Sequence, residues 1–184
     1  MQNNPWKVLS TKVVYENPWI KVHEDAVIRP DGNEGIYGFI ESRDSVIVIV
    51  LNEHDEVYVI RNFSYPVSAW SWEFPGGGGD NQEPEVASKR ELAEETGIIA
   101  EKWTFLGKKR VSNGLLSERM AIYVAQDLTF GERQRADDSE IITGGKFISI
   151  REALQMTLSG DIDDGQTITG LYLLEHWLAD QKQA

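Results

Sequence analysis

Cysteine is absent from this chain of 184 residues, so it has no disulfide framework, zinc–thiolate site or cysteine nucleophile. Basic residues are scarce, 18 against 30 acidic ones, and the net charge is −12. This charge argues against nonspecific nucleic-acid binding, which depends on Lys and Arg meeting phosphates. No hydrophobic run is long enough to cross a bilayer, and the first residues, MQNNPWKVLS, lack a signal-peptide pattern. We therefore expect a soluble, cytoplasmic protein with no membrane partner.

The first forty residues have the pattern of a small antiparallel sheet. Residues 6–15 and 19–28 are rich in β-branched and aromatic side chains, with a turn at Asn17-Pro18 between them. Asp31-Gly32 predicts a hairpin turn into a third strand at 36–40.

The rest of the chain alternates further strands with helices. Residues 45–51 (SVIVIVL) are apolar throughout, which is typical of a strand covered on both faces. Residues 84–96 predict a helix, because proline stands near its start and Gly97 follows its end. Further strands are expected at 57–63, 103–106, 119–125 and 146–150, and helices at 150–158 and 166–181. This mixture predicts a layered α/β or α+β domain.

Residues 72–98 are the most informative stretch of the sequence. Four successive glycines, 76–79, are expected to close a strand and open into a loop whose backbone approaches a ligand closely. A flexible turn is the alternative explanation of such a run.

Three glutamates follow the glycines at helical spacing. Glu91, Glu94 and Glu95 stand at i, i+3 and i+4, so a helix places them on one face, where they repel one another unless a cation lies among them. Oxygen ligands on a rigid face suit Mg²⁺ or Mn²⁺. A solvated acidic face is the alternative. Arg90 is placed to pair with one carboxylate and orient it.

Residues 90–98 (RELAEETGI) resemble the second half of the Nudix box, R-E-U-x-E-E-x-G-U with U aliphatic, at all seven specified positions. The first half, G-x5-E-x7, aligns in two ways. Counting back from Arg90 puts Gly76 at the glycine and Gln82 at the glutamate. A one-residue deletion before the helix aligns Gly77 and Glu83 instead, and both alignments stay open.

The flanks resemble the ADP-ribose and nucleotide-sugar pyrophosphatase branch of this family, at residues 57–66, 72–75, 112–119 and 161–167. Residues 6–40 resemble the extra sheet through which that branch forms intertwined homodimers. The resemblance implies a Nudix-type α/β/α sandwich with a mixed central sheet at 43–184, and an N-terminal antiparallel dimerisation sheet at 1–42.

The resemblance also implies a site that uses Mg²⁺, with Mn²⁺ as a second option. The metal ligands it implies are the backbone carbonyl of Gly76 and the carboxylates of Glu91, Glu95 and, next, Glu94. Metal ions would let this acidic protein accept an anionic substrate.

The resemblance further implies a catalytic base, or an additional ligand, from the acidic loop at 137–140, with Glu140 first, Asp138 behind it and Glu94 as a further catalytic candidate. A solvated loop is the alternative. The substrate contacts carried over from the branch are Arg61, Glu73, Gly77 and Glu118. An ordinary surface charge is the alternative explanation of Arg61. The three histidines match no metal-ligand spacing.

The expected function is metal-dependent hydrolysis of a nucleoside diphosphate linked to another moiety. ADP-ribose, giving AMP and ribose 5-phosphate, is the first substrate, and GDP-mannose or another nucleotide sugar is the second. Free nucleoside triphosphates are a third class. Two rivals are an inactive Nudix-fold sensor of a nucleotide metabolite and a structural dimerisation domain.

Overall fold

The computed structural model describes residues 4–133 and 141–182, and the chain divides into two compact units. The first unit contains residues up to 43 together with residues 110–119. The second contains residues 44–109 and those from 120 onward. The strand pattern of the sequence did not predict that residues 110–119 join the first unit.

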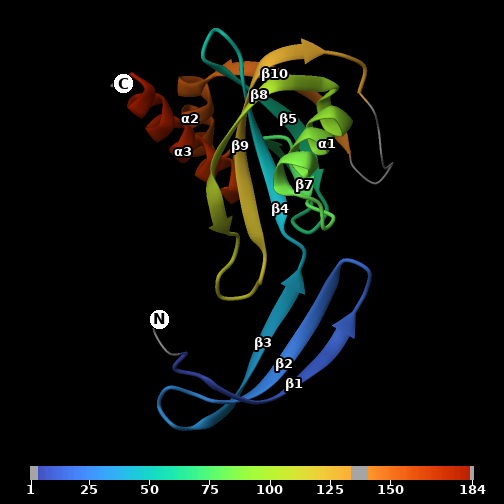
Figure 1. Ribbon diagram of the computed structural model, residues 1–184, viewed down its shortest axis with the longest axis vertical. Coiled ribbons are helices and arrows are strands. Elements are labelled where there is room, and N and C mark those ends of the chain that lie inside the picture. The colour runs from blue at the N-terminus through green and yellow to red at the C-terminus, as the bar shows by residue number, and fades with distance from the viewer. Residues whose placement is uncertain (1–3, 134–140, 183–184) are drawn as a thin grey trace. The chain divides into compact units, whose positions relative to one another are not determined.

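The first unit is a three-stranded antiparallel sheet in the order β1-β2-β3 (Figure 1). Its strands are β1 (Lys7–Glu16), β2 (Ile20–Ile28) and β3 (Glu34–Ser42), which confirms the three predicted strands with small shifts at their ends. The Ile40 N–H donates to the Leu115 carbonyl at 2.8 Å, so the 110–119 loop is bonded to β3. Strand β1 is exposed along its whole length.

The second unit is built on a mixed sheet in the order β10-β5-β4-β9-β8, with β6 paired to β5 and β7 to β4. β4 runs parallel to β9 and antiparallel to β5 and β7, so the expected mixed sheet is confirmed. The strands are β4 (Ser45–Leu51), β5 (Glu56–Ser64), β6 (Ala69–Glu73), β7 (Gly76–Gly78), β8 (Ile98–Arg110), β9 (Arg119–Phe130) and β10 (Ile142–Ser149).

Three helices accompany this sheet, and their predicted positions are confirmed. They are α1 (Pro84–Thr96), α2 (Ile150–Ser159) and α3 (Gly165–Gln181). α1 ends as predicted at Gly97, which is left-handed with φ 73° and donates its N–H to the Ala93 carbonyl at 3.0 Å. α3 begins after Asp164, whose carboxylate accepts the first free backbone N–H groups of the helix.

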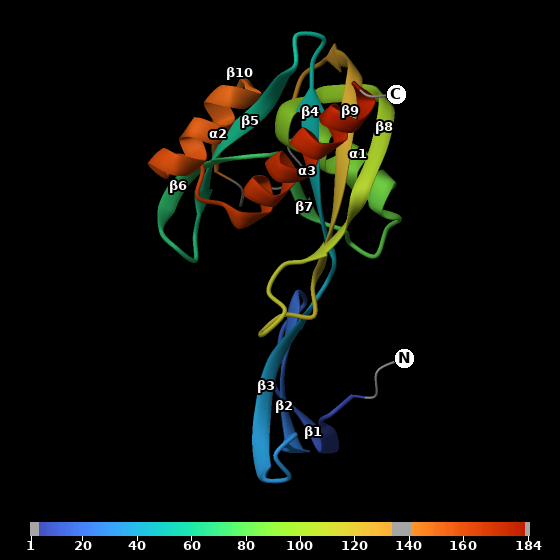
Figure 2. The ribbon, with the colours of Figure 1, turned by 90° about the vertical axis from the view of Figure 1, so that its left-hand side faces the viewer.

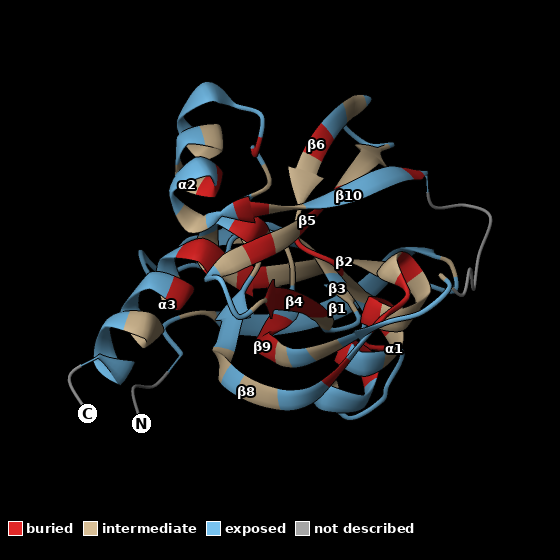
Figure 3. Cartoon of the chain, turned by 90° about the horizontal axis from the view of Figure 1, so that it is seen from above, coloured by how far each residue is buried: buried red, intermediate tan, exposed pale blue. Residues whose placement is uncertain are grey.

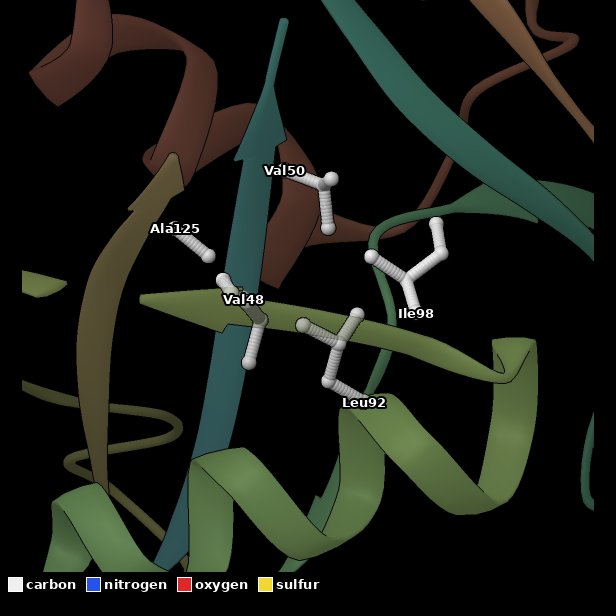
Figure 4. Packing of buried hydrophobic residues seen from close by; sticks show 6 residues of the cluster. Val48, Val50, Leu92, Ile98 and Ala125 are labelled. Carbon is white, nitrogen blue, oxygen red and sulfur yellow. The ribbon is translucent and has the colours of Figure 1, made fainter. Parts of the chain in front are cut away.

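The central strand β4 packs on both faces, as its apolar run predicted. Val48 and Val50 join Leu92 of α1 in one buried cluster (Figure 4). Ile47 points to the opposite face, where its Cδ1 lies 3.1 Å from a Cβ built on Gly170 of α3. Figure 2 looks onto α2 and α3, and Figure 3 shows the sheet between them and α1 with buried residues along its middle.

The glycine run was expected to close a strand and open into a loop, and most of it is itself a strand, with the loop beginning after Gly78. Three of the four glycines form β7, which pairs with β4 in a register that sets Gly76 opposite Ile47. A Cβ on Gly76 would lie 2.3 Å from the Val46 carbonyl oxygen, so only glycine allows this approach. The pairing is between distant segments, and it outweighs the turn preference of glycine.

The other differences from the sequence-based expectations concern where strands begin and end. Strand β6 is the strand expected before the glycines, although it ends at Glu73, and β8 and β9 are longer than the runs that predicted them. In the described ranges, no helix combines the length and the apolar character needed to span a membrane.

Candidate active site

Two of the three glutamates on α1 are buried. Glu91 and Glu95, one helical turn apart, are each 5% exposed, whereas the Glu94 side chain is 22% exposed. A carboxylate buried this far needs hydrogen-bond donors or a cation, because removing its charge from water is costly. The groups beside Glu91 and Glu95 therefore decide what the site can hold.

Both buried carboxylates lie against the backbone of β7, which runs next to α1 (Figure 1). The Gly76 N–H donates to Glu95 Oε2 at 2.7 Å. A Cβ built on Gly77 would lie 2.7 Å from the carboxylate carbon of Glu91, so that carboxylate occupies the space a side chain would take. The glycines thus bring backbone to within contact of two helix-borne carboxylates.

The segment that leads into β7 is anchored from two further elements. The Pro75 carbonyl accepts the Val48 N–H of β4 at 2.8 Å. The Phe74 N–H donates to Thr167 Oγ1 of α3 at 3.0 Å, and that buried hydroxyl donates to Asp164 at 2.7 Å. The glycine strand is therefore held in place by β4, α1 and α3 together.

Arg90 pairs with carboxylates of its own helix, as expected for an orienting residue. Its Nη2 lies 2.9 Å from Glu91 Oε1, and its Nη1 donates to Glu94 Oε2 at 2.8 Å. Burial acts to lower the pKa of Arg90, but the charges of Glu91 and Glu94 outweigh it and raise that pKa above its ordinary value. The guanidinium remains a cation between the two carboxylates.

The structure distinguishes the two residues that compete for the first glutamate position of the motif. Gln82 is hydrogen-bonded to Arg90: its Oε1 accepts the Arg90 Nε–H at 3.1 Å. Glu83 is the N-cap position of α1. Burial raises the pKa of Tyr123, and the charges of Glu85 and Glu83 raise it further, so Glu83 lies near that ring.

Glu73 and Arg61 lie on opposite faces of the sheet. The Arg61 guanidinium lies over the Trp72 ring, with its Cζ 5.6 Å from the ring centroid. Lys146 Nζ lies 4.8 Å from the same centroid and forms an ion pair with Glu152 of α2. Glu73 is opposite Ile60, one residue earlier on β5, and accepts an N–H of Asn62 at 2.6 Å. Since side chains alternate along a strand, Glu73 shares the face of α1 and Arg61 does not.

The remaining predicted residues are Glu118, Glu140, Asp138 and Gly77. Glu118 belongs to the first unit, where its carbonyl accepts the Val111 N–H at 3.5 Å. Glu140 and Asp138, the candidate bases, lie outside the described residues. Gly77, expected to bind substrate, lies instead against Glu91, as described above.

Sequence reasoning missed several residues that support the site. Asp80 contacts Arg90 at 3.2 Å, although no periodicity marks a residue in the loop between a strand and a helix. Asp164 and Thr167 stood within a flank that matched the family, and aspartate is favoured at the N-cap of a helix. Their link to Phe74 is tertiary and had no local signal.

Comparison with known proteins assigns the chain to a class. NUDIX domains match residues 41–169, and the nucleoside diphosphate sugar hydrolase N-terminal domain matches residues 6–40. These matches make the protein a hydrolase that acts on pyrophosphate bonds. It belongs to the Nudix family, and the resemblance to the branch of ADP-ribose and nucleotide-sugar pyrophosphatases is confirmed.

Individual relatives span nearly the whole chain at low identity. The ADP-ribose pyrophosphatase of Bacillus subtilis is 23% identical over 170 residues, 92% of each chain. The methanol dehydrogenase activator of Bacillus methanolicus is 25% identical over 170 residues, again 92% of each. A crystal structure of an ADP compounds hydrolase covers all of both chains with a TM-score of 0.84 and 22% identity.

Nudix hydrolases generally use divalent metal ions. The donors on α1 fit such an ion chemically, because Glu91 and Glu95 supply hard carboxylate oxygens and Gly77 leaves room for one of them. In the part of the chain that the structure describes, no three Asp, Glu or His side chains gather to hold a metal. The Glu94 carboxylate is bound to Arg90 instead of joining the other two.

We expect Gly77→Ala to fold and to lose activity. The new Cβ meets the end of the flexible Glu91 side chain, so Glu91 moves while the strand stays paired. Pyrophosphatase activity should fall by about tenfold to a hundredfold, with little change in the melting temperature. Gly165→Ala is the control, because a Cβ there meets nothing within 4 Å. Full activity in Gly77→Ala would show that the position of Glu91 does not matter.

Proposed function

We propose that this protein hydrolyses the diphosphate of ADP-ribose to AMP and ribose 5-phosphate, with a divalent cation held at Glu91 and Glu95. The observation that carries the proposal is the pair of buried carboxylates pressed onto the glycine strand within a Nudix motif. Mg²⁺ is the first candidate and Mn²⁺ the second, since both prefer oxygen ligands.

The chemistry requires positive charge next to an anionic substrate. A diphosphate repels a nucleophile, and a bound divalent cation would neutralise its oxygens and lower the pKa of a water molecule. The chain's net charge of −12 repels an anionic substrate. The residues that hold the cation would therefore be the ones that make substrate binding possible. Glu91 and Glu95 would hold the cation, and the Gly76 N–H fixes the Glu95 carboxylate.

Other roles in this proposal come from the family resemblance. Glu140, with Asp138 behind it, is the proposed base, and Glu73 shares the sheet face of α1, which supports its proposed substrate contact. Glu94, bound to Arg90, is better placed to hold that arginine than to take a proton from water. Arg61 and Glu118 stay predictions, as does a cytoplasmic location.

The choice of ADP-ribose rests on the relatives. The Bacillus subtilis relative carries that activity in its name, and the N-terminal match is to a hydrolase of nucleoside diphosphate sugars. GDP-mannose and other nucleotide sugars contain the same diphosphate link and are the second candidate substrates.

A substrate panel tests the reaction directly. ADP-ribose, ADP-glucose, GDP-mannose, UDP-glucose, NADH and the deoxynucleoside triphosphates are incubated with Mg²⁺, Mn²⁺ or EDTA, and products are separated by chromatography. We expect metal-dependent release of AMP from ADP-ribose, abolished by EDTA. Turnover of GDP-mannose alone would assign the second candidate substrate. No turnover of any compound by folded protein would favour the metabolite sensor, to which the glutamine at position 82 lends some support.

Glu95→Gln separates an enzyme from a structural domain. The variant keeps the shape of the side chain but removes a metal-binding charge, so the rate should fall by about a hundredfold or more while the fold persists. Glu101→Gln, at an exposed position on β8, makes the same change in charge and should leave the rate unchanged. A structural dimerisation domain instead predicts equal or higher stability for Glu95→Gln and no other effect, because a like-charge contact is relieved.

We also propose a homodimer formed through the first unit. Strand β1 is an edge strand, exposed throughout, and Val13 and Val14 are each 46% exposed on it. Unpaired, apolar edge strands pair readily with another chain. Light scattering should give about 42 kDa, twice the chain mass of 20.8 kDa, and Val13→Lys should shift it toward the monomer. A monomeric mass for the unaltered protein would exclude the dimer.

A further inference from the structure

The end of β7 and the loop between β7 and α1 contact the guanidinium of Arg90. The Gly78 carbonyl accepts an Nη2–H at 2.8 Å, and Gln82 Oε1 accepts the Nε–H at 3.1 Å. Asp80 adds a carboxylate, with its Oδ2 3.2 Å from the same Nη2. The last residue of β7 and two residues of the loop that follows it therefore contact one side chain of the helix.

Asp80 and Glu91 share one nitrogen of Arg90. Glu91 Oε1 lies 2.9 Å from Nη2, and Asp80 Oδ2 lies 3.2 Å from it. Their environments differ, because the Asp80 side chain is 51% exposed and the Glu91 side chain 6%. The exposed carboxylate thus offsets part of the arginine's positive charge from the solvent side, while the buried one faces Gly77.

In the ungapped alignment, which puts Gly76 at the glycine of the family motif, Gln82 stands where the motif has a glutamate. An amide oxygen accepts the Arg90 Nε–H but carries no charge, so Gln82 supplies the hydrogen bond alone. In this chain the charge comes from Asp80, two residues earlier in the same loop. Gln82 and Asp80 therefore contact Arg90 through a neutral and a charged oxygen respectively.

We propose that Asp80 is a positioning residue that replaces the missing charge of the motif and keeps Arg90 from drawing Glu91 away from Gly77. The proposal rests on the proposed function only in assigning Glu91 to the cation. Without Asp80, Nη2 has Glu91 as its one remaining carboxylate partner among those the structure records for it. Glu91 would then bind a cation less readily, because its charge is committed to the arginine.

The test is a double-mutant cycle of Asp80→Asn and Gln82→Glu, read by Mn²⁺ binding to the protein in electron paramagnetic resonance and by the Mg²⁺ concentration that half-saturates hydrolysis. Asp80→Asn should weaken Mn²⁺ binding about fivefold, in line with a half-exposed ion pair. In that background Gln82→Glu should restore binding, because its carboxylate reaches the same guanidinium.

The coupling between the two changes distinguishes positioning from general electrostatics. In the unaltered background Gln82→Glu should change Mn²⁺ affinity by about twofold or less, since Arg90 is already held. Equal effects of Gln82→Glu in both backgrounds would overturn the proposal, because they would mean that any added charge acts alike. Asp163→Asn, an exposed aspartate on the loop before α3, is the matched control for charge and should bind Mn²⁺ normally.

Further outcomes decide between the positioning role and its alternatives. Unaltered Mn²⁺ binding by Asp80→Asn, or a loss of thermal stability without a change in binding, would overturn the positioning role. If Asp80→Asn does not fold, Asp80→Glu and Asp80→Ser replace it, and equal Mn²⁺ affinity in those two overturns the proposal in the same way. If the protein turns over no substrate but the cycle shows coupling in Mn²⁺ binding, the proposed function fails and this inference stands. A protein that binds no Mn²⁺ would overturn both.

Discussion

Burial of two carboxylates against a strand of glycines is the constraint on which the rest of this structure depends. A charged group nine-tenths removed from water is stable only with donors or a cation beside it, and Glu95 has the Gly76 N–H. Glu91 reaches Gly77 because that position has no side chain. The close approach of β7 and α1 therefore depends on Gly77, because a larger residue there would push the Glu91 carboxylate away.

The same constraint explains why three elements meet at the glycine strand. A strand of three residues has little stability of its own, so its position is fixed by pairing with β4, by the hydroxyl of Thr167 and by the Glu95 carboxylate. α3 lies on the opposite face of the sheet from α1, yet it reaches the site through Phe74. The core and the candidate active site are thus one continuous arrangement.

Charge is distributed in this site so that a single cation, Arg90, holds several carboxylates in place. It contacts Glu91 and Glu94 from its own helix and Asp80 from the loop. Three negative charges around one guanidinium leave a net negative centre in a protein whose overall charge is already −12. The proposed divalent cation would offset part of this negative charge, as a hydrolase of anionic substrates requires.

The sequence by itself determined the local parts of the protein. Residues 84–96 form the predicted helix because proline, helical spacing and Gly97 all act within a few residues. That helix alone brings Glu91 and Glu95 to one side. Only the tertiary structure decided that the glycines pair with β4, that Asp80 rather than Gln82 carries charge to Arg90, and that Arg61 lies on the far face. These outcomes depend on contacts between distant segments and on strand register, neither of which leaves a local pattern.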